Sequence, residues 1–136
     1  QVEGPAKEGL DLFYGGYAAE DEIEAAIGAL YNEQGYLMDT HTAAAYKVYQ
    51  DYLAETGDDT PAVITATASP YKFAGSVSRA LGLPQAGDEF SAILQLAEKT
   101  GVPVPAGLTG LQQRKIRHGL TVAPEAMSDT VLNALK

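Results

Sequence analysis

The sequence predicts an α/β fold, in which helices pack around a small, mainly parallel sheet. Several segments carry apolar residues at helical spacing, and short apolar runs stand between some of them. These runs are few for so many helices, so we expect the sheet to be incomplete here and finished by other polypeptide. The chain begins with Gln1 rather than Met, which also indicates processing or a part of a longer protein.

The first helix is expected after the break at Gly15 and Gly16. Asp21 followed by Glu24 resembles a capping box, and apolar residues at helical spacing come next. Gly35 is a typical C-terminal stop. The apolar piece at residues 36–38 is then a candidate strand.

A second helix is expected to follow Asp39 and to end at Gly57. Free backbone N–H groups at a helix start favour an anion, which makes His41 and Thr42 candidate site residues. The alternative is that Thr40 or Thr42 caps the helix while His41 fills a polar niche. The spacing alone favours this alternative without excluding an anion site.

The apolar run at residues 62–65 is the clearest predicted strand. Thr67 stands at its carboxyl end, where ligands bind in open α/β sheets. Ser69 and Pro70 suit the N-cap and first position of a new helix, which Gly82 should end. Lys72 lies in the first turn of this helix, with no glycine-rich phosphate loop nearby, and we expect it to be solvated.

Three more helices complete the prediction. One runs from about Phe90 and is ended by Gly101. A stiff connector follows, and the next helix is expected from Thr109 to about His118, with basic residues near its end. The last helix begins after Pro124.

The composition limits the classes of partner and of chemistry. The chain has 136 residues, of which 46% are hydrophobic and 20% charged, enough for one domain with a core. Its formal net charge is −9, whereas nucleic acids and anionic membranes attract clustered Lys and Arg. We therefore expect neither as a partner. No cysteine is present, which fits a reducing compartment, and we expect the cytoplasm.

Few residues suit metal binding or nucleophilic catalysis. His41 with the nearby Asp39 supplies only two possible ligands, so we expect no metal site. The glycine motifs of serine hydrolases and of nucleotide-binding loops are absent from the sequence.

Two motifs together resemble a known family. Residues 38–46, Met-Asp-Thr-His-Thr-Ala-Ala-Ala-Tyr, resemble the Asp-Pro-His-Thr-Ala-Val segment of threonine synthases. Residues 66–73, Ala-Thr-Ala-Ser-Pro-Tyr-Lys-Phe, resemble that family's Thr-Ala-His-Pro-Ala-Lys-Phe segment. Thr40, Ser69 and Tyr71 depart from the family's Pro, His and small residue.

The resemblance implies that residues 1–136 are a single C-terminal region of an enzyme of fold type II that uses pyridoxal 5'-phosphate (PLP). That family converts O-phosphohomoserine and water to L-threonine and phosphate. It implies that Thr67 meets the pyridine nitrogen of PLP, with His41, Thr42 and Ser69 as active-site neighbours.

The resemblance also leaves part of the machinery outside this chain. The family's Schiff-base lysine motif and phosphate loop have no counterpart here, so we assign no catalytic residue. We expect the N-terminal part of the same enzyme to be a partner. We also expect the fragment alone to be inactive and to bind no PLP. The alternative is a free-standing α/β binding or interaction module without catalysis.

Overall fold

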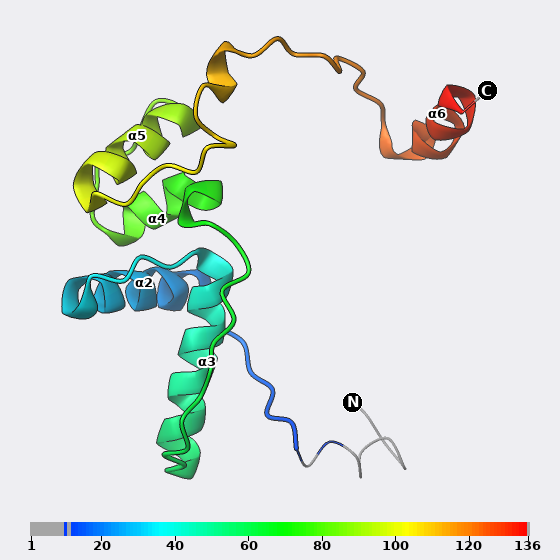
Figure 1. Ribbon diagram of the computed structural model, residues 1–136. Coiled ribbons are helices and arrows are strands. Elements are labelled where there is room, and N and C mark those ends of the chain that lie inside the picture. The colour runs from blue at the N-terminus through cyan, green and yellow to red at the C-terminus, as the bar shows by residue number, and fades with distance from the viewer. Residues whose placement is uncertain (1–9, 11, 136) are drawn as a thin grey trace. The chain divides into compact units, whose positions relative to one another are not determined.

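The computed structural model describes residues 10 and 12–135 and divides the chain into two units, Gln1–Ala106 and Gly107–Lys136. The first unit contains α2 (Glu20–Gln34), α3 (Thr40–Thr56), the 3-10 helix η1 (Pro70–Phe73), α4 (Ala74–Ala80) and α5 (Glu89–Thr100). The second contains two 3-10 turns, η2 (Leu111–Gln113) and η3 (Pro124–Ala126), and α6 (Met127–Ala134) (Figure 1).

The predicted sheet is wrong, because the described residues form helices and connections but no strand. Residues 36–38 join α2 to α3, and the adjacent Leu37 and Met38 are both buried. Two adjacent buried residues lack the alternation between a buried and an exposed face that a strand at the edge of a core would show. Residues 62–65 also lie outside helix and strand, and Val63 is 94% exposed. The three β-forming residues Val63, Ile64 and Thr65 do not make a sheet without a neighbouring strand.

The helix ends follow the sequence signals, with one shift. The backbone N–H of Ala19 donates to Glu22 Oε2 at 2.8 Å, so the box at the start of α2 uses Glu22 and not the predicted pair Asp21 and Glu24. Gly35 ends this helix in the left-handed conformation at φ 71°, as predicted. The predicted stops of α3 and α5, Gly57 and Gly101, are confirmed in the same way.

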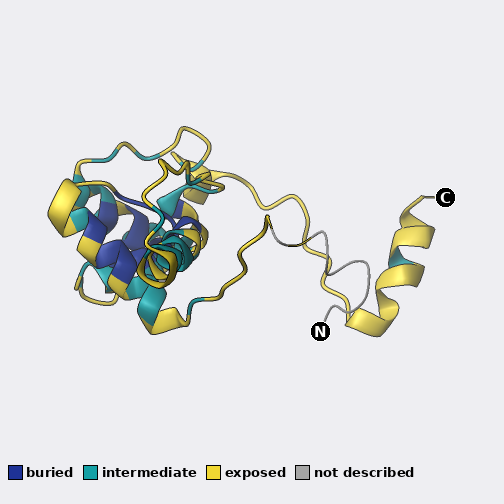
Figure 2. Cartoon of the chain, turned by 90° about the horizontal axis from the view of Figure 1, so that it is seen from below, coloured by how far each residue is buried: buried dark blue, intermediate teal, exposed yellow. Residues whose placement is uncertain are grey.

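The core of the first unit lies between its helices, as the buried residues in Figure 2 show. Helix α4 packs against both α2 and α5, and α3 packs against α2. Gly28 marks the close approach of α2 to α4, since a Cβ there would lie 2.7 Å from the carbonyl oxygen of Ala80. The fully buried side chains include Ile27, Val77 and Leu96.

The second unit contains much less regular structure than predicted. The helix expected from Thr109 to about His118 is reduced to η2, and Arg114 already has extended dihedrals, φ −77° and ψ 142°. Short helices need packing to be stable, and residues 111–129 are all exposed. The helix predicted after Pro124 is confirmed as η3 and α6. Among the described residues, no helix is long and apolar enough to cross a membrane.

Candidate functional site

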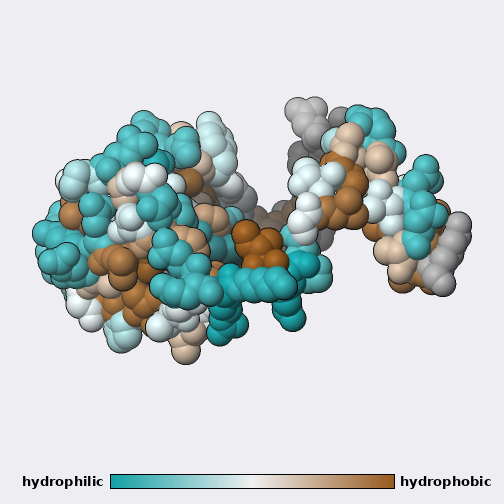
Figure 3. Space-filling view, turned by 90° about the horizontal axis from the view of Figure 1, so that it is seen from above, coloured by the Kyte–Doolittle hydropathy of each residue, from teal (hydrophilic) through white to brown (hydrophobic). Residues whose placement is uncertain are grey.

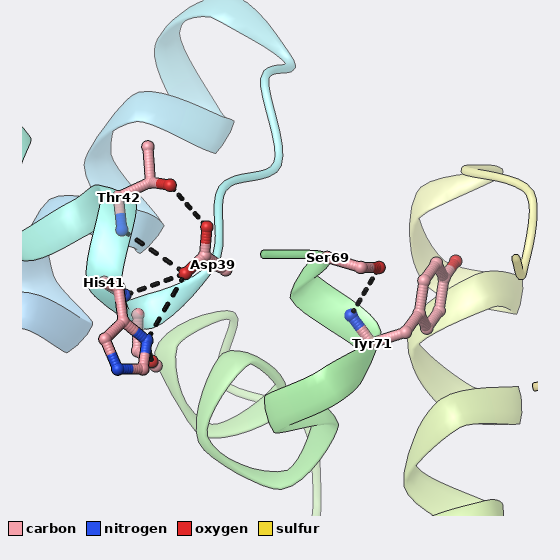
Figure 4. A network of polar contacts seen from close by, with 6 residues as sticks. Asp39, His41, Thr42, Ser69 and Tyr71 are labelled. Carbon is pink, nitrogen blue, oxygen red and sulfur yellow. Dashed lines mark hydrogen bonds and ion pairs between the residues drawn. The ribbon is translucent and has the colours of Figure 1, made fainter. Parts of the chain in front are cut away.

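The start of α3 is built around a buried carboxylate. Asp39 is 1% exposed, and its Oδ1 accepts the backbone N–H groups of His41 at 2.9 Å and Thr42 at 3.3 Å (Figure 4). Its Oδ2 accepts a hydrogen bond from the Thr42 hydroxyl. The protein's own carboxylate thus occupies the N–H groups considered for an external anion. The helix is capped, but by Asp39 rather than by Thr40 or Thr42.

His41 lies at the edge of this cap with its side chain 64% exposed. Its Nδ1 is 3.6 Å from Asp39 Oδ1 and 3.5 Å from the Thr40 hydroxyl oxygen, so no short hydrogen bond fixes the ring. The ring instead packs against Phe73, with the two centroids 5.0 Å apart.

The start of η1 is fixed from two sides. Ser69 caps it as predicted, because its Oγ accepts the backbone N–H of Tyr71 at 3.3 Å. Pro70 occupies the first helical position, also as predicted. Tyr71 is 2% exposed, and its hydroxyl donates to the carbonyl oxygen of Val102. The side chain of Tyr71 therefore ties the start of η1 to the connector after α5.

Thr67 is exposed and lies two residues before the Ser69 cap, outside helix and strand. Its hydroxyl makes no hydrogen bond to any residue that the structure describes. It is therefore not at the end of a strand, but it is free to meet a ligand. A donor and acceptor of this kind fits a pyridine nitrogen.

The two motifs that carried the sequence resemblance meet in space. His41 from the start of α3 contacts Phe73 from η1, the element that Ser69 caps. Thr42 is 5% exposed and its hydroxyl is engaged by Asp39, so it supports the helix start rather than facing a ligand. Lys72 is exposed, with Nζ 5.3 Å from the ring centroid of Phe73.

A hollow of about 460 Å³ opens beside Thr42. Its lining includes Met38, Tyr36 and Tyr46 together with Ile64, and it has no charged residue. Such a lining suits an apolar group better than a phosphate. The described residues also hold no group of three or more metal-binding side chains.

The segment that carries Thr67 is anchored at its other end by Asp58. This carboxylate accepts hydrogen bonds from the Thr60 hydroxyl at 2.6 Å, the Thr60 backbone N–H at 3.0 Å and the Tyr52 hydroxyl at 2.6 Å. These bonds, those of Thr60 first, lower the pKa of Asp58 to about 2. The same contact with Asp58 raises the pKa of Tyr52.

Two residues of this region were missed by the sequence reasoning. Asp39 was considered only as a metal ligand, although an Asp directly before a helical pattern is a common N-cap. Tyr71 was noted only as a departure from the family pattern. No local sequence pattern predicts the hydrogen bond of Tyr71 to Val102, because the two residues are far apart in sequence.

Comparisons with known proteins place this region in a family. The family model described as "Threonine synthase, C-terminal" matches residues 42–131. Threonine synthase-like 1 of Mus musculus is 37% identical over 84 residues, covering 62% of this chain and 11% of that protein. Threonine synthase-like 1 of Homo sapiens is 36% identical over 97 residues, covering 71% and 13%.

The matched stretch is thus a small part of these relatives, between 11% and 13% of their length. The family model, in contrast, covers most of this chain and includes Thr67, Ser69 and Tyr71. The chain therefore belongs to the threonine synthase C-terminal family.

Proposed function

We propose that this chain is the C-terminal part of a PLP-dependent threonine synthase that forms L-threonine and phosphate from O-phosphohomoserine and water. In this proposal Thr67 binds the pyridine nitrogen of PLP. The observation that carries it is the exposed, unengaged Thr67 hydroxyl two residues before the Ser69 cap, within the stretch that the family model matches.

Thr67 suits this role because its hydroxyl can donate or accept a hydrogen bond and carries no charge. A neutral partner does not force the ring nitrogen to be protonated, as a carboxylate would. When bound, PLP supplies the electron sink for carbanion chemistry, and the protein tunes and orients it.

The neighbouring residues act by holding this segment in place. Ser69 fixes the backbone two residues after Thr67, and Tyr71 fastens the same turn to Val102. His41 packs on Phe73 and presents an exposed ring next to this turn. We assign His41 and Ser69 to the surroundings of the site, and Thr42 to the support of the Asp39 cap.

The proposal requires a second part of the enzyme. The sequence has no counterpart of the Schiff-base lysine motif or of the phosphate loop, so we expect the preceding polypeptide to supply both. We expect the 136-residue chain alone to bind no PLP and to form no threonine. The cytoplasm is the compartment that we expect for the enzyme.

The test is to express the complete reading frame that contains this chain and to measure threonine and phosphate formed from O-phosphohomoserine. Thr67→Val should shift the absorbance of bound PLP and lower turnover by about 5- to 150-fold, which corresponds to the cost of about 1–3 kcal/mol for a lost polar contact. Thr67→Ser, which keeps the hydroxyl, should retain most of both properties.

Thr65→Val is the matched control, since Thr65 is an exposed threonine of the same segment. It should change neither spectrum nor rate. A Thr67→Val enzyme with the spectrum and turnover of the parent would contradict the assignment. A reading frame that starts directly before Gln1 would instead favour a binding module without catalysis.

A further inference from the structure

The second unit contains apolar residues that are not buried in a core. All residues from 111 to 129 are exposed, although Ile116, Leu120 and Met127 lie in this stretch. Ile116 is 85% exposed and Leu120 is 77% exposed. Apolar side chains of this unit show on its surface in Figure 3. Single exposed apolar residues are common, but a whole unit of them calls for a partner.

Residues 115–122 alternate in chemical type. The even positions carry three apolar residues and one histidine, namely Ile116, His118, Leu120 and Val122. The odd positions carry the two cations and two small residues, namely Lys115, Arg117, Gly119 and Thr121. Residues 115–123 form no helix, and Arg114 and Ala123 have extended dihedrals on either side of them. In an extended chain, even and odd positions point to opposite sides. One side is therefore mainly apolar, and the other side carries both cations.

The basic residues Arg114, Lys115 and Arg117 do not lie at the C-terminal end of a helix, where the sequence predicted them. A helix through His118 would have placed them at its negative end, but that helix is absent. Three of the chain's nine Lys and Arg residues lie at positions 114–117, in a chain with a net charge of −9. The structure gives them no ion pair among the described residues.

Helix α6 also carries exposed apolar residues at helical spacing, Met127 at 56% and Val131 at 57% exposure, and Leu135 directly after the helix is 79% exposed. None of the described residues of α6 is buried. A segment that buries so little cannot offset the conformational entropy lost on ordering it. Yet the family model extends through residue 131, so this unit belongs to the family domain.

We propose that residues 114–135, the C-terminal arm, form a docking surface that orders against the preceding polypeptide of the same enzyme. The partner surface is an apolar groove with carboxylates along one side, matching the apolar and basic sides of residues 115–122. We select the preceding polypeptide as the partner because nearly nine-tenths of the length of the relatives lies outside the stretch that this chain matches. The inference rests on the proposed function, which requires that polypeptide.

Trypsin tests the inference directly, because the arm offers cleavage sites at Arg114, Lys115 and Arg117. In the 136-residue chain, cleavage there should outpace cleavage at Lys47 and Arg79, which lie in packed helices. In the protein expressed from the complete reading frame, cleavage of the arm should be at least about tenfold slower, because cleavage follows the population of the open form. Raised salt should partly restore it.

A matched pair of variants separates the two sides of the arm. Leu120→Asp places a charge on the apolar side and should restore fast cleavage in the complete protein. Thr121→Asp adds the same charge one residue later, on the opposite side, and should restore it much less. Cleavage at Lys47 should stay slow in both variants, which shows that the first unit remains folded.

Several results would overturn the docking surface. Equal cleavage rates in the chain alone and in the complete protein would do so, as would equal effects of Leu120→Asp and Thr121→Asp. Protection in the isolated chain that rises with protein concentration would point to a second copy as the occupant and would also overturn it. An enzyme whose PLP spectrum responds to Thr67→Val but whose arm is cleaved freely contradicts this inference alone. A protected arm on a protein without threonine synthase activity contradicts only the proposed function.

Discussion

The two units of this chain contain the same kinds of apolar side chain, but the first unit buries many of them and the second leaves them exposed. Leu96 in the first unit is fully buried, whereas Leu135 in the second is 79% exposed. In the first unit α4 packs against both α2 and α5, so each helix covers the apolar face of another. In the second unit α6 has no described residue buried. Apolar composition alone does not make a core, because each apolar face also needs a partner.

The comparison also bears on the candidate site. Thr67 belongs to the first unit but lies in the segment between α3 and η1, where no helix or strand supports it. That segment is held near its ends, by Asp58 after α3 and by Ser69 before η1. The cofactor-binding residue that we propose therefore has fixed ends and an accessible middle, which suits a ligand completed from elsewhere.

The largest difference between the units should come from truncating a leucine in each. Leu96→Ala removes a fully buried side chain from α5 and should lower the free energy of unfolding by about 2–5 kcal/mol. Leu132→Ala removes a side chain that is 57% exposed and should change it by less than about 0.5 kcal/mol. Denaturant unfolding of the 136-residue chain measures both, and comparable losses would break the comparison.

A smaller effect is expected where two helices approach most closely. Gly28→Ala puts a Cβ 2.7 Å from the backbone oxygen of Ala80, which cannot move without shifting α4. We expect a loss of about 1–3 kcal/mol, larger than the gain of about 1 kcal/mol from the helix propensity of Ala. Gly87→Ala is the control, because a Cβ there meets nothing within 4 Å. Thermal unfolding that ranks the two variants the other way would refute the close packing.

The cap of α3 should contribute less than the core contacts. Asp39→Ala removes the acceptor of two backbone N–H groups and of the buried Thr42 hydroxyl, and should cost about 1–2 kcal/mol. Asp129→Ala, in the first turn of α6, should cost less than about 0.5 kcal/mol. If removal of Asp39 leaves chemical denaturation unchanged, the carboxylate does not hold this helix start.

The smallest effect that we expect is the loss of stability at acidic pH when Asp58, which anchors the segment that carries Thr67, becomes protonated. The folded-state pKa of Asp58 is about 2, below the ordinary value, so its contacts stabilise the fold at neutral pH. They are fully present above the unfolded-state pKa near 4 and are lost as pH falls toward 2. Carbon-detected NMR of the Asp58 carboxyl should follow this titration. A midpoint near the ordinary value would show that the bonds from Thr60 and Tyr52 do not persist in solution.

Local signals predicted the helices of the first unit well. Ser69 and Pro70 define a helix start through the side-chain oxygen and the fixed φ of proline, and Gly35, Gly57 and Gly101 stop helices through the left-handed conformation. These signals act within a few residues of where they stand. The same local reasoning proposed Thr67, His41 and Ser69 as site residues, but it missed the Asp39 cap and the bond from Tyr71 to Val102.

The errors came from segments whose structure depends on distant partners. Residues 62–65 have β-forming side chains but no neighbouring strand among the described residues, and the expected helix ending near His118 has nothing to pack on. Met38 is buried, a fact that its neighbours in sequence do not reveal. The link from Tyr71 to Val102 likewise needs the folded arrangement.

Hydrogen exchange on the 136-residue chain tests the contrast between the two units most directly. Exchange protection reports local opening, and buried helices open least. The backbone amides of α5 around Leu96 should exchange far more slowly than an unstructured peptide does. The amides of α6 around Leu132 should exchange at nearly the unstructured rate. Protection of α6 equal to that of α5 in the isolated chain would contradict the claim that only the first unit has a core of its own.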